Sequence, residues 1–219
     1  MKFAVLGTGM VGNALATKLV SLGHEVRMGA RDKANEKAAA WARQNGAKAS
    51  HGTFADAAAF AEIAIVAANG AVVLEVARQA GPDNLAGKVV IDVTNPLDFS
   101  QGMPPALIAE FANTNSLGEE LQKALPTARV VKALNTVNCQ VMVDPARVPG
   151  KTDIFLCGND DAAKQTVREL LVSFGWTDPI DLGPISAARG TEGMMPFWLR
   201  MYGALGSADF NYRIERAAK

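Results

Sequence analysis

The chain has 219 residues, and its 22 Lys and Arg residues balance its 22 Asp and Glu residues. A chain of this length buries the core of one α/β domain, or of a domain with a modest extension. The balanced charge gives no electrostatic reason to expect a nucleic acid or an anionic membrane as a partner.

Short apolar runs alternate with helical patterns through the first part of the chain. The run at residues 2–7 is almost fully apolar and ends in glycine, as in a parallel strand covered on both faces. Apolar residues then recur at helical spacing from Val11 to Leu22, and Gly23 ends that helix. The alternation continues with strands at 24–29, near His51, and at 61–68, 88–94 and 128–134, and with helices at 33–46 and 71–81.

The pattern loosens between Thr94 and Thr127 and then resumes. Because ligands of doubly wound sheets bind at the carboxyl ends of the strands, we expect the loose segment to form part of a substrate pocket. A strand at 152–158, a helix at 160–175, a short strand near 179–183 and an apolar helix at 185–205 follow. This alternation predicts an α/β fold with a doubly wound parallel sheet of the Rossmann type. Residues 1–150 would form its core, and residues 151–219 a short α/β extension packed on the same body.

A glycine-rich loop follows the first strand. Gly7, Gly9 and Gly12 have the spacing G-x-G-x-x-G between a buried strand and an amphipathic helix, which is the context that gives this pattern meaning. Gly7 permits the tight turn, Gly9 lets the backbone approach a pyrophosphate, and Gly12 lets helix and strand pack closely. The free amides at the start of the helix favour a diphosphate. The loop therefore predicts dinucleotide binding, with further contacts from Thr8, Met10 and Val11.

The end of the second strand indicates which dinucleotide binds. NAD-binding chains carry an acid there, whereas this chain has the neutral Gly29 and Ala30, followed by Arg31. A guanidinium binds phosphate in a bidentate manner, so we predict NADP. Lys33 and Lys37 are the two candidates for a second positive charge. Asp32 lies past the strand end, where we expect it to cap a helix.

No residue pattern indicates a catalytic group or a metal site. His24 and His51 are isolated, and Cys139 and Cys157 form no CxxC pair, so we interpret the thiols as free thiols of a reducing cytoplasm. The chain opens on a strand rather than on a signal peptide. Its longest apolar run, at 63–74, is too short to cross a bilayer. We expect a cytoplasmic protein that does not bind membranes.

Three features near the predicted ligand edge have two interpretations each. Asn95 and Asn135 end strands there, and either residue could bind the cofactor or cap its own turn. Arg189 and Glu192 stand one helical turn apart and could pair with each other. The apolar residues of the last helix predict a homodimer, or else a flat slot for a ring lined by Met194, Met195, Pro196 and Trp198.

Several stretches of the chain resemble one known family. They are "GTGMVGNALATKLVSLGHEVRMGARD" from Gly7, "VIDVTNP" from Val90, "VVKALNT" from Val130, "FLCGNDDAAK" from Phe155 and "DLGPISAAR" from Asp181. In this order they resemble coenzyme F420-dependent NADP oxidoreductases along nearly the whole chain. The same fold group includes the NADPH-binding domain of the STEAP metalloreductases, to which "FNYRI" at 210–214 is closer.

The resemblance implies direct hydride transfer between C4 of the nicotinamide and C5 of a deazaflavin. NADP would be the cofactor, and F420 or a flavin (FMN or FAD) the co-substrate. The family pattern assigns NADP binding to Thr8, Gly9, Val11, Ala30 and Arg31, and places Ala133, Leu134 and Asn135 beside the nicotinamide. The family commonly has Ser or Thr at position 30. It often has Val-Pro after the fourth strand, where this chain reads "AANG" at residues 67–70. Asn69 therefore alters the wall near the nicotinamide, and Ala68 and Asn69 are candidate cofactor contacts.

Two other functions compete with this one. The first is an NADPH-dependent reductase of a small imine or carbonyl compound, although such enzymes usually carry a large helical domain that this chain does not resemble. The second is a non-catalytic NADPH sensor, which a charged or apolar interaction tail would support. Such a sensor would report the redox state to a partner, whereas the two enzymes would act on small molecules and depend on the chemistry of the bound cofactor.

Overall fold

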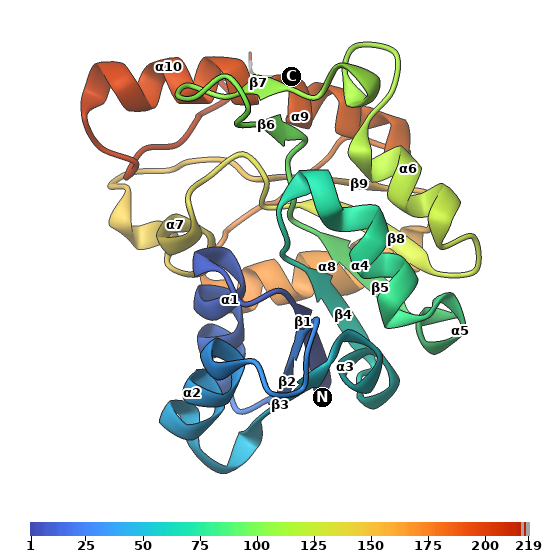
Figure 1. Ribbon diagram of the computed structural model, residues 1–219. Helices are drawn as coiled ribbons and strands as arrows, with labels where there is room; N and C mark the ends of the chain where they lie inside the picture. The colour runs from blue at the N-terminus through green and yellow to red at the C-terminus, as the bar shows by residue number, and fades with distance from the viewer. Residues whose placement is uncertain (216, 218–219) are drawn as a thin grey trace.

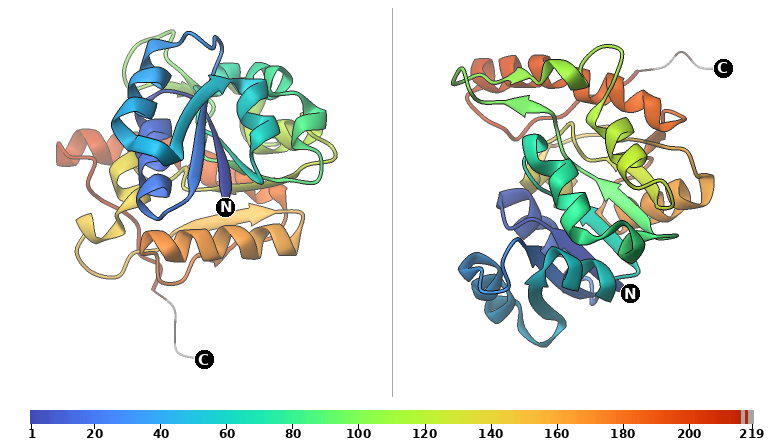
Figure 2. Two further views of the ribbon diagram at one scale, coloured as in Figure 1. Left: turned by 90° about the horizontal axis from the view of Figure 1, so that it is seen from below. Right: turned by 45° about the vertical axis from the view of Figure 1, so that its right-hand side comes forward.

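The computed structural model describes residues 1–215 and 217. Within these residues the main sheet has eight strands, in the order β10-β9-β8-β5-β4-β1-β2-β3. Helices cover both faces of this sheet (Figures 1 and 2). The strands β1, β2, β3, β4, β5 and β8 pair in parallel, which is the Rossmann-type doubly wound α/β arrangement predicted from the sequence.

The elements follow in chain order. Those of the first half are β1 (Lys2–Leu6), α1 (Met10–Ser21), β2 (Glu25–Ala30), α2 (Glu36–Asn45), β3 (Ala49–Thr53), α3 (Phe54–Phe60), β4 (Ile63–Val66), α4 (Val73–Ala80), α5 (Pro82–Leu85) and β5 (Val89–Asp92). Those of the second half are β6 (Leu97–Asp98), β7 (Ala106–Leu107), α6 (Leu117–Ala124), β8 (Arg129–Ala133), α7 (Cys139–Val143), β9 (Phe155–Gly158), α8 (Asp161–Phe174), β10 (Ile180–Asp181), α9 (Ala188–Gly193) and α10 (Met195–Leu205).

Alternation along each strand divides the core into two layers. Phe3 and Val5 of β1 face the layer that contains α1, α2, α7 and α8. Ala4 and Leu6 of the same strand face the layer that contains α3, α4, α5 and α6. Successive side chains of a strand point to opposite faces, so a strand buried on both faces must be apolar at every position. This requirement explains the continuous apolar runs from which the strands were predicted.

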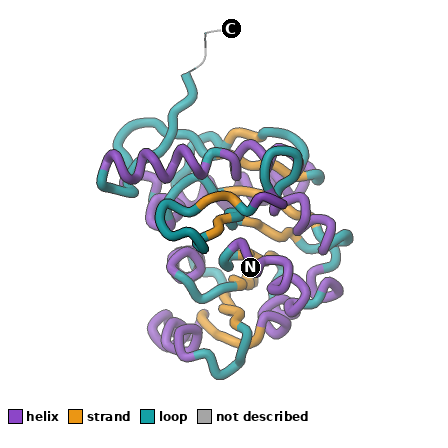
Figure 3. The backbone as a smooth tube through the Cα atoms, turned by 45° about the horizontal axis from the view of Figure 1, so that its top comes forward, coloured by secondary structure: helices purple, strands orange, loops and turns teal. Residues whose placement is uncertain are grey.

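The segment after β5 covers the carboxyl edge of the sheet. The antiparallel ribbon of β6 and β7 lies there, and α10 packs beside it at the top of Figure 1. Figure 3, in which that edge is turned forward, shows helix and loop lying across the strand ends. The loose segment predicted between Thr94 and Thr127 therefore lies where ligands of this fold class bind.

The residues after 150 extend the same sheet. β9 runs antiparallel to β8, and β10 runs parallel to β9. Two successive strands can pair in parallel only if a crossover connection carries the chain from the carboxyl end of the first strand back to the level of its amino end. Between β8 and β9 the chain forms two short helical segments, the five-residue helix α7 and a 3-10 helix at Pro145–Arg147, joined by loops, so it turns back on itself. The sheet is therefore mostly parallel, as the predicted doubly wound fold requires, with one antiparallel pairing between β8 and β9.

Three local expectations also differ from the structure. The single helix expected at 185–205 is broken at Met194, since Gly193 precedes this residue and Pro196 lacks an amide hydrogen. Helix α3 was not predicted. It has only seven residues and begins with a capping box between Thr53 and Asp56. Helix α2 begins at Glu36 rather than at residue 33, because Asn35 caps it.

Among the residues that the structure describes, no helix combines the length and the apolar character needed to cross a membrane.

Helix α10 exposes large apolar side chains, from which we expect a homodimer. Phe197 is 57% exposed and Leu205 is 53% exposed. Burial of such side chains against a second copy would remove apolar surface from water. We expect light scattering to give the mass of a dimer, and the variant Leu205→Glu to shift the protein toward the monomer.

The matched control is Val172→Glu on α8, where the valine is 51% exposed on a different helix. This variant should keep the dimer. A wild-type mass that stays at one chain across the concentration range would contradict the expectation.

Candidate functional site

The phosphate loop has the close packing that its glycines predict. Gly7 has φ of 139°, and a Cβ there would lie 2.3 Å from the carbonyl oxygen of Ala67. A Cβ on Gly12 would lie 2.2 Å from the carbonyl oxygen of Gly7. By contrast, a Cβ on Gly9 would meet nothing within 4 Å. Gly7 and Gly12 are therefore required by the fold, whereas Gly9 leaves open space in front of α1.

Helix α1 offers an uncapped N-terminus to that space. Its N-cap residue, Gly9, forms no side-chain cap, and its first turn carries no acid. The first amides of a helix carry a partial positive charge and favour an anion. The side chain of Met10 is mostly exposed at this end. The loop therefore fits the diphosphate of a dinucleotide.

The end of β2 presents one cation and no acid. Gly29 and Ala30 are buried, and Arg31 is exposed directly after the strand. Within residues 1–215 and 217, Arg31 forms no ion pair, so its guanidinium is available to a ligand. The expected helix cap at Asp32 is wrong. This carboxylate accepts a hydrogen bond from the amide of Ala34 in a turn, because Asn35 is the residue that caps α2.

A cavity of about 410 Å³ lies at the carboxyl ends of the strands. Its lining comes from the phosphate loop, from the loops that follow β4, β5 and β8, and from the β6 segment, α7 and α10. Its lining includes the predicted residues Gly9, Met10, Val11, Ala68, Asn69, Asn95 and Asn135, together with Thr94, Leu97, Phe99, Cys139, Met142, Met195 and Trp198. We call this space the strand-end cavity.

A second cavity lies beside the phosphate loop, between α1, α2 and α7. It is lined by the predicted residues Thr8, Gly9, Met10 and Lys37, and also by Asn13, Trp41, Gln44 and Cys139. Lys37 is exposed and faces this second cavity rather than the first. Gly9, Met10 and Cys139 border both cavities, so the N-terminus of α1 stands between them.

Asn95 and Asn135 bind each other. The Nδ2 of Asn95 donates to the carbonyl oxygen of Asn135 at 2.8 Å, and the Nδ2 of Asn135 donates to the Oδ1 of Asn95 at 2.9 Å. The expectation that each might cap its own turn is therefore wrong. The pair joins the loop after β5 to the loop after β8 in the wall of the cavity. Asn69 does cap its own turn, since its Oδ1 accepts from the amide of Ala71 at 3.0 Å.

Two of the residues predicted beside the nicotinamide lie in the core. Ala133 and Leu134 are buried, and neither lines either cavity. Leu134 has φ of 64°, a left-handed conformation that costs a non-glycine residue roughly 1–2 kcal/mol. This bend ends β8 and brings the next residue, Asn135, to the cavity wall. Of the three residues that the resemblance places beside the nicotinamide, Asn135 lines the strand-end cavity, and Ala133 and Leu134 do not.

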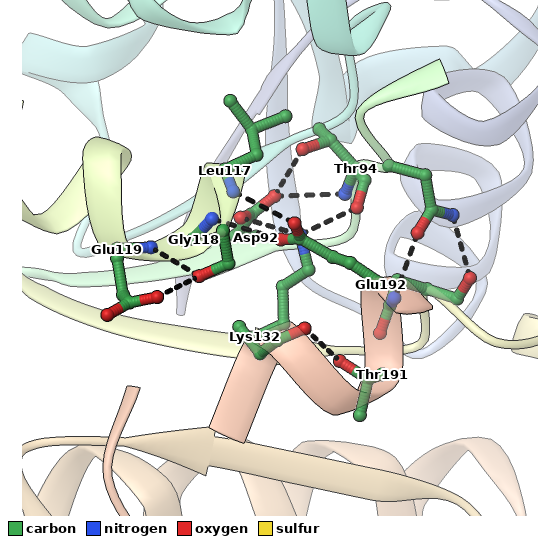
Figure 4. A network of polar contacts seen from close by, with 12 residues as sticks. Asp92, Thr94, Leu117, Gly118, Glu119, Lys132, Thr191 and Glu192 are labelled. Carbon is green, nitrogen blue, oxygen red and sulfur yellow. Dashed lines mark hydrogen bonds and ion pairs between the residues drawn. The ribbon is translucent and has the colours of Figure 1, made fainter. Parts of the chain in front are cut away.

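A buried ion cluster holds these strand ends together (Figure 4). The Nζ of Lys132 lies 2.9 Å from Asp92 Oδ2 and 2.7 Å from Glu192 Oε1, and it also donates to the carbonyl oxygen of Thr94 at 2.6 Å. Asp92 comes from β5, Lys132 from β8 and Glu192 from α9. The side chains of all three are at most 1% exposed. We call these three residues the buried ion cluster.

Each carboxylate of the cluster also accepts from neighbouring donors. Glu192 accepts from the amides of Leu117 and Gly118 at 2.8 and 3.0 Å, at the start of α6. Asp92 accepts from the amide and the hydroxyl of Thr94, which lines the strand-end cavity. The expected pair of Arg189 with Glu192 is therefore wrong, because Arg189 pairs with Glu119 at 2.6 Å instead.

The electrostatics of the cluster keep Lys132 charged. Burial alone would lower the pKa of this ammonium, but the two carboxylates outweigh that effect and raise the pKa above its ordinary value. Burial raises the pKa of the Glu192 carboxyl, and the Lys132 ammonium opposes the rise. Every donor that faces Glu192 needs an acceptor oxygen, so we infer that this side chain is ionised at neutral pH.

Sequence analysis missed the cluster and part of the cavity wall. Asp92 and Lys132 each interrupt an otherwise apolar strand, which is a detectable indication of a buried pair. Cys139 and Met142 follow β8 closely and were treated only as unremarkable residues. Phe99 lies in the loose segment, where no periodic pattern indicates which side chains turn inward. Met195 and Trp198 of the predicted apolar slot do line the cavity, whereas Met194 and Pro196 do not.

Fold and loop together define the class of this protein. A doubly wound sheet, a glycine loop against an uncapped helix and a cavity at the strand ends are the features of dinucleotide-binding oxidoreductases.

Comparison with known proteins narrows this class to a family. The family model described as "NADP oxidoreductase coenzyme F420-dependent" matches residues 2–96. The F420-dependent NADP reductase of Methanocaldococcus jannaschii is 30% identical over 204 residues, which cover 90% of each chain. A solved structure from Arthrobacter sp. fb24, provisionally named an F420-dependent NADP-reductase, is 48% identical with a TM-score of 0.94. That match covers 99% of this chain and 100% of the other.

A longer relative shares only part of its length. Metalloreductase STEAP3 of Rattus norvegicus is 30% identical over 202 residues, which cover 90% of this chain but only 38% of STEAP3. The match with the Methanocaldococcus jannaschii reductase, by contrast, covers 90% of both chains. This chain therefore belongs to the family of F420-dependent NADP oxidoreductases. It is an NADP-dependent oxidoreductase of that family.

The glycines of the loop allow binding to be separated from folding. Gly9→Ala should keep the melting temperature within about 2 °C of wild type, since its Cβ enters open space. It should weaken the binding of NADPH at least about tenfold, because the added methyl group keeps the diphosphate from approaching the backbone. Calorimetric titration and thermal melting measure the two effects.

Gly12→Ala is the matched variant. Its Cβ would clash with the Gly7 carbonyl, so it should lower the melting temperature by at least about 4 °C. Equal affinity of Gly9→Ala and wild type for NADPH would rule out the phosphate loop as the diphosphate site.

The two thiols should differ in reactivity. Burial raises the pKa of Cys157 to about 12, and its side chain is inaccessible. Cys139 is partly exposed and borders both cavities. We expect iodoacetamide at pH 8 to label Cys139 alone. NADPH at ten times its Kd should slow this labelling about tenfold.

Mass spectrometry of the intact protein counts the labels. The Cys139→Ala variant should remain unlabelled, and the denatured wild type should carry two labels. An unchanged labelling rate at saturating NADPH would show that the cofactor binds away from Cys139.

Proposed function

We propose that this protein transfers hydride between NADP(H) and the deazaflavin coenzyme F420. Family membership supports NADP as the cofactor, and the names of the relatives make F420 the first acceptor to test. The observation that carries the proposal is the strand-end cavity. It is lined by residues of the phosphate loop and of the strand ends, and also by Phe99, Met195 and Trp198. Such a space suits two flat rings that lie face to face.

The residues around the loop fit NADP. Gly9 leaves room for the diphosphate in front of the uncapped helix α1. Arg31 would bind the 2′-phosphate, and no acid stands at Gly29 or Ala30 to repel it. Gly7 and Gly12 would act by shaping the loop. We propose Thr8, Met10, Val11 and Lys37 as further contacts near the diphosphate, and Ala68, Asn69, Asn95 and Asn135 as contacts near the nicotinamide.

The chemistry belongs to the two cofactors. Bound together, they would supply the transfer of a hydride, with its two electrons, from C4 of the nicotinamide to C5 of the deazaflavin, and water would supply the remaining proton. The protein must hold the reacting atoms about 3–3.5 Å apart and keep water from between them. Asn95 and Asn135, locked to each other, would give the nicotinamide a rigid wall. The apolar side chains opposite would exclude water.

The cavity lining supports transfer without a protein acid or base. Among the described residues that line it, Cys139 is the one with a titratable side chain. Reduction of an imine or a carbonyl compound needs a proton at the moment of hydride transfer, usually from a positioned side chain. His24 packs against Phe3 and His51 lies in β3, and neither reaches the cavity. The described lining thus offers no carboxyl, imidazole or ammonium group as a proton donor, which favours the deazaflavin over the imine or carbonyl acceptor.

An acceptor screen tests the proposal. Purified protein with NADPH is mixed in turn with F420, FMN, FAD and a cyclic imine, and acceptor loss is followed by absorbance. We expect F420 to be reduced with a kcat/KM at least about tenfold above that of either flavin. Reduction of the imine without reduction of F420 would favour the imine reductase. Binding of NADPH without turnover of any acceptor would favour the NADPH sensor.

Arg31 should determine the choice between NADPH and NADH. A charge-assisted hydrogen bond contributes roughly 1.5–3 kcal/mol, which is about ten- to a hundredfold in affinity. Arg31→Ala should lower the affinity for NADPH by that factor and change the affinity for NADH little, as measured by calorimetric titration.

Arg43→Ala is the matched control, because it removes the same charge from the last turn of α2, where Arg43 lines neither cavity. It should leave both affinities within about twofold. Equal losses of NADPH and NADH affinity in Arg31→Ala would refute the role of Arg31 in phosphate binding.

A further inference from the structure

The second cavity has no occupant in the proposed binding of the two rings. It has a volume of about 730 Å³ and lies between α1, α2 and α7, which are neighbours in Figure 1. Gly9, Met10 and Cys139 border this cavity and the strand-end cavity alike, so the two spaces adjoin at the start of α1. The diphosphate of NADP would lie at this junction and leave the length of α2 free.

One face of each of two helices lines the second cavity. Residues three, four and seven positions apart share one face of a helix, and the lining residues of α1 and α2 have this spacing. They are Met10, Asn13 and Ala14 on α1, and Lys37, Ala40, Trp41 and Gln44 on α2. Asn13, Lys37 and Gln44 are exposed, so a ligand can reach their polar atoms.

The charge of the second cavity favours an anion. The described residues that line it include Lys37 and no Asp or Glu. Lys37 forms no ion pair with another described residue, so its ammonium is available to a ligand. Asn13, Gln44 and Gln140 add side-chain amides, whose N–H groups can donate to phosphate or carboxylate oxygens.

We propose that the second cavity binds the anionic tail of the hydride acceptor. F420 carries a ribityl chain, a phosphodiester and carboxylate groups on its deazaflavin ring. With the ring in the strand-end cavity, the charged groups would lie along α2 from Lys37 toward Gln44, a rise of about 10 Å that suits a chain better than a single ion. The inference rests on the proposed function and adds the part of the acceptor by which the protein would select it.

The test compares F420 with its tail-free form, 8-hydroxy-5-deazariboflavin, which has the same ring and ribityl chain but no phosphodiester or carboxylate. At saturating NADPH, we expect kcat/KM for F420 to exceed that for the tail-free form at least about tenfold. The difference should lie in KM, because the tail takes no part in hydride transfer. A rise in salt from about 0.05 to 0.5 M should reduce this ratio, since salt screens exposed charges.

Two variants test whether the tail lies in the second cavity. Lys37→Gln removes the ammonium, and Gln44→Glu adds a carboxylate two turns further along α2. Each should lower the ratio of the two kcat/KM values at least about threefold, because each makes the cavity less favourable to an anion. Gln165→Glu is the matched control, since it makes the same change at an exposed position of α8 that lines neither cavity. It should leave the ratio unchanged.

The outcomes separate the two proposals. Equal kcat/KM for F420 and the tail-free form, or a preference for F420 that both variants leave intact, would refute the tail site while the proposed function stands. If FMN is reduced and neither deazaflavin is, the deazaflavin is rejected. The tail site then survives if the two variants lower the kcat/KM of FMN relative to riboflavin, and falls if they do not. If no deazaflavin or flavin is reduced, both proposals fall.

Discussion

The ion pairing of Lys132 with Asp92 and Glu192 is the interaction on which the architecture of the site depends. Removal of one partner from such a buried set leaves an uncompensated charge and costs about 3–5 kcal/mol. That is a large share of the roughly 5–15 kcal/mol by which a folded domain exceeds its unfolded state. Because the three residues come from β5, β8 and α9, the cost enforces one relative placement of two strand ends and the C-terminal helices.

The same placement fixes the positions of the residues that line the strand-end cavity. Thr94 binds both Asp92 and Lys132 and also lines the cavity, so the cluster reaches the cavity wall through a single residue. Asn95 and Asn135 extend the link between the same two strand ends. On the far side, α10 follows α9 after one residue and contributes Met195 and Trp198. The wall proposed for the nicotinamide and the wall proposed for the acceptor are thereby held at a fixed separation, which suits a reaction governed by ring geometry.

Local patterns in the sequence predicted most of the fold and the near side of the site. Strands buried on both faces leave continuous apolar runs, and the glycines of the loop recur at a short fixed spacing, so both patterns are visible in the sequence. The far side was harder, because its form depends on contacts between distant segments. Glu192 forms an ion pair with Lys132, which lies sixty positions earlier in the sequence, and the residues next to either one do not indicate this pairing. The break at Met194 and the reversal of β9 follow from the same long-range packing, as does the burial of Ala133 and Leu134 away from the cavity.

The central claim is that hydride passes directly between two rings in the strand-end cavity. NADPH deuterated at both C4 positions, mixed with F420 and the protein in ordinary water, tests it by the mass of the reduced deazaflavin. Direct transfer predicts one deuterium retained at C5 of the product, since the transferred nucleus never exchanges with solvent. A reduced product that carries only hydrogen at C5 would contradict direct transfer and with it the proposed use of the cavity.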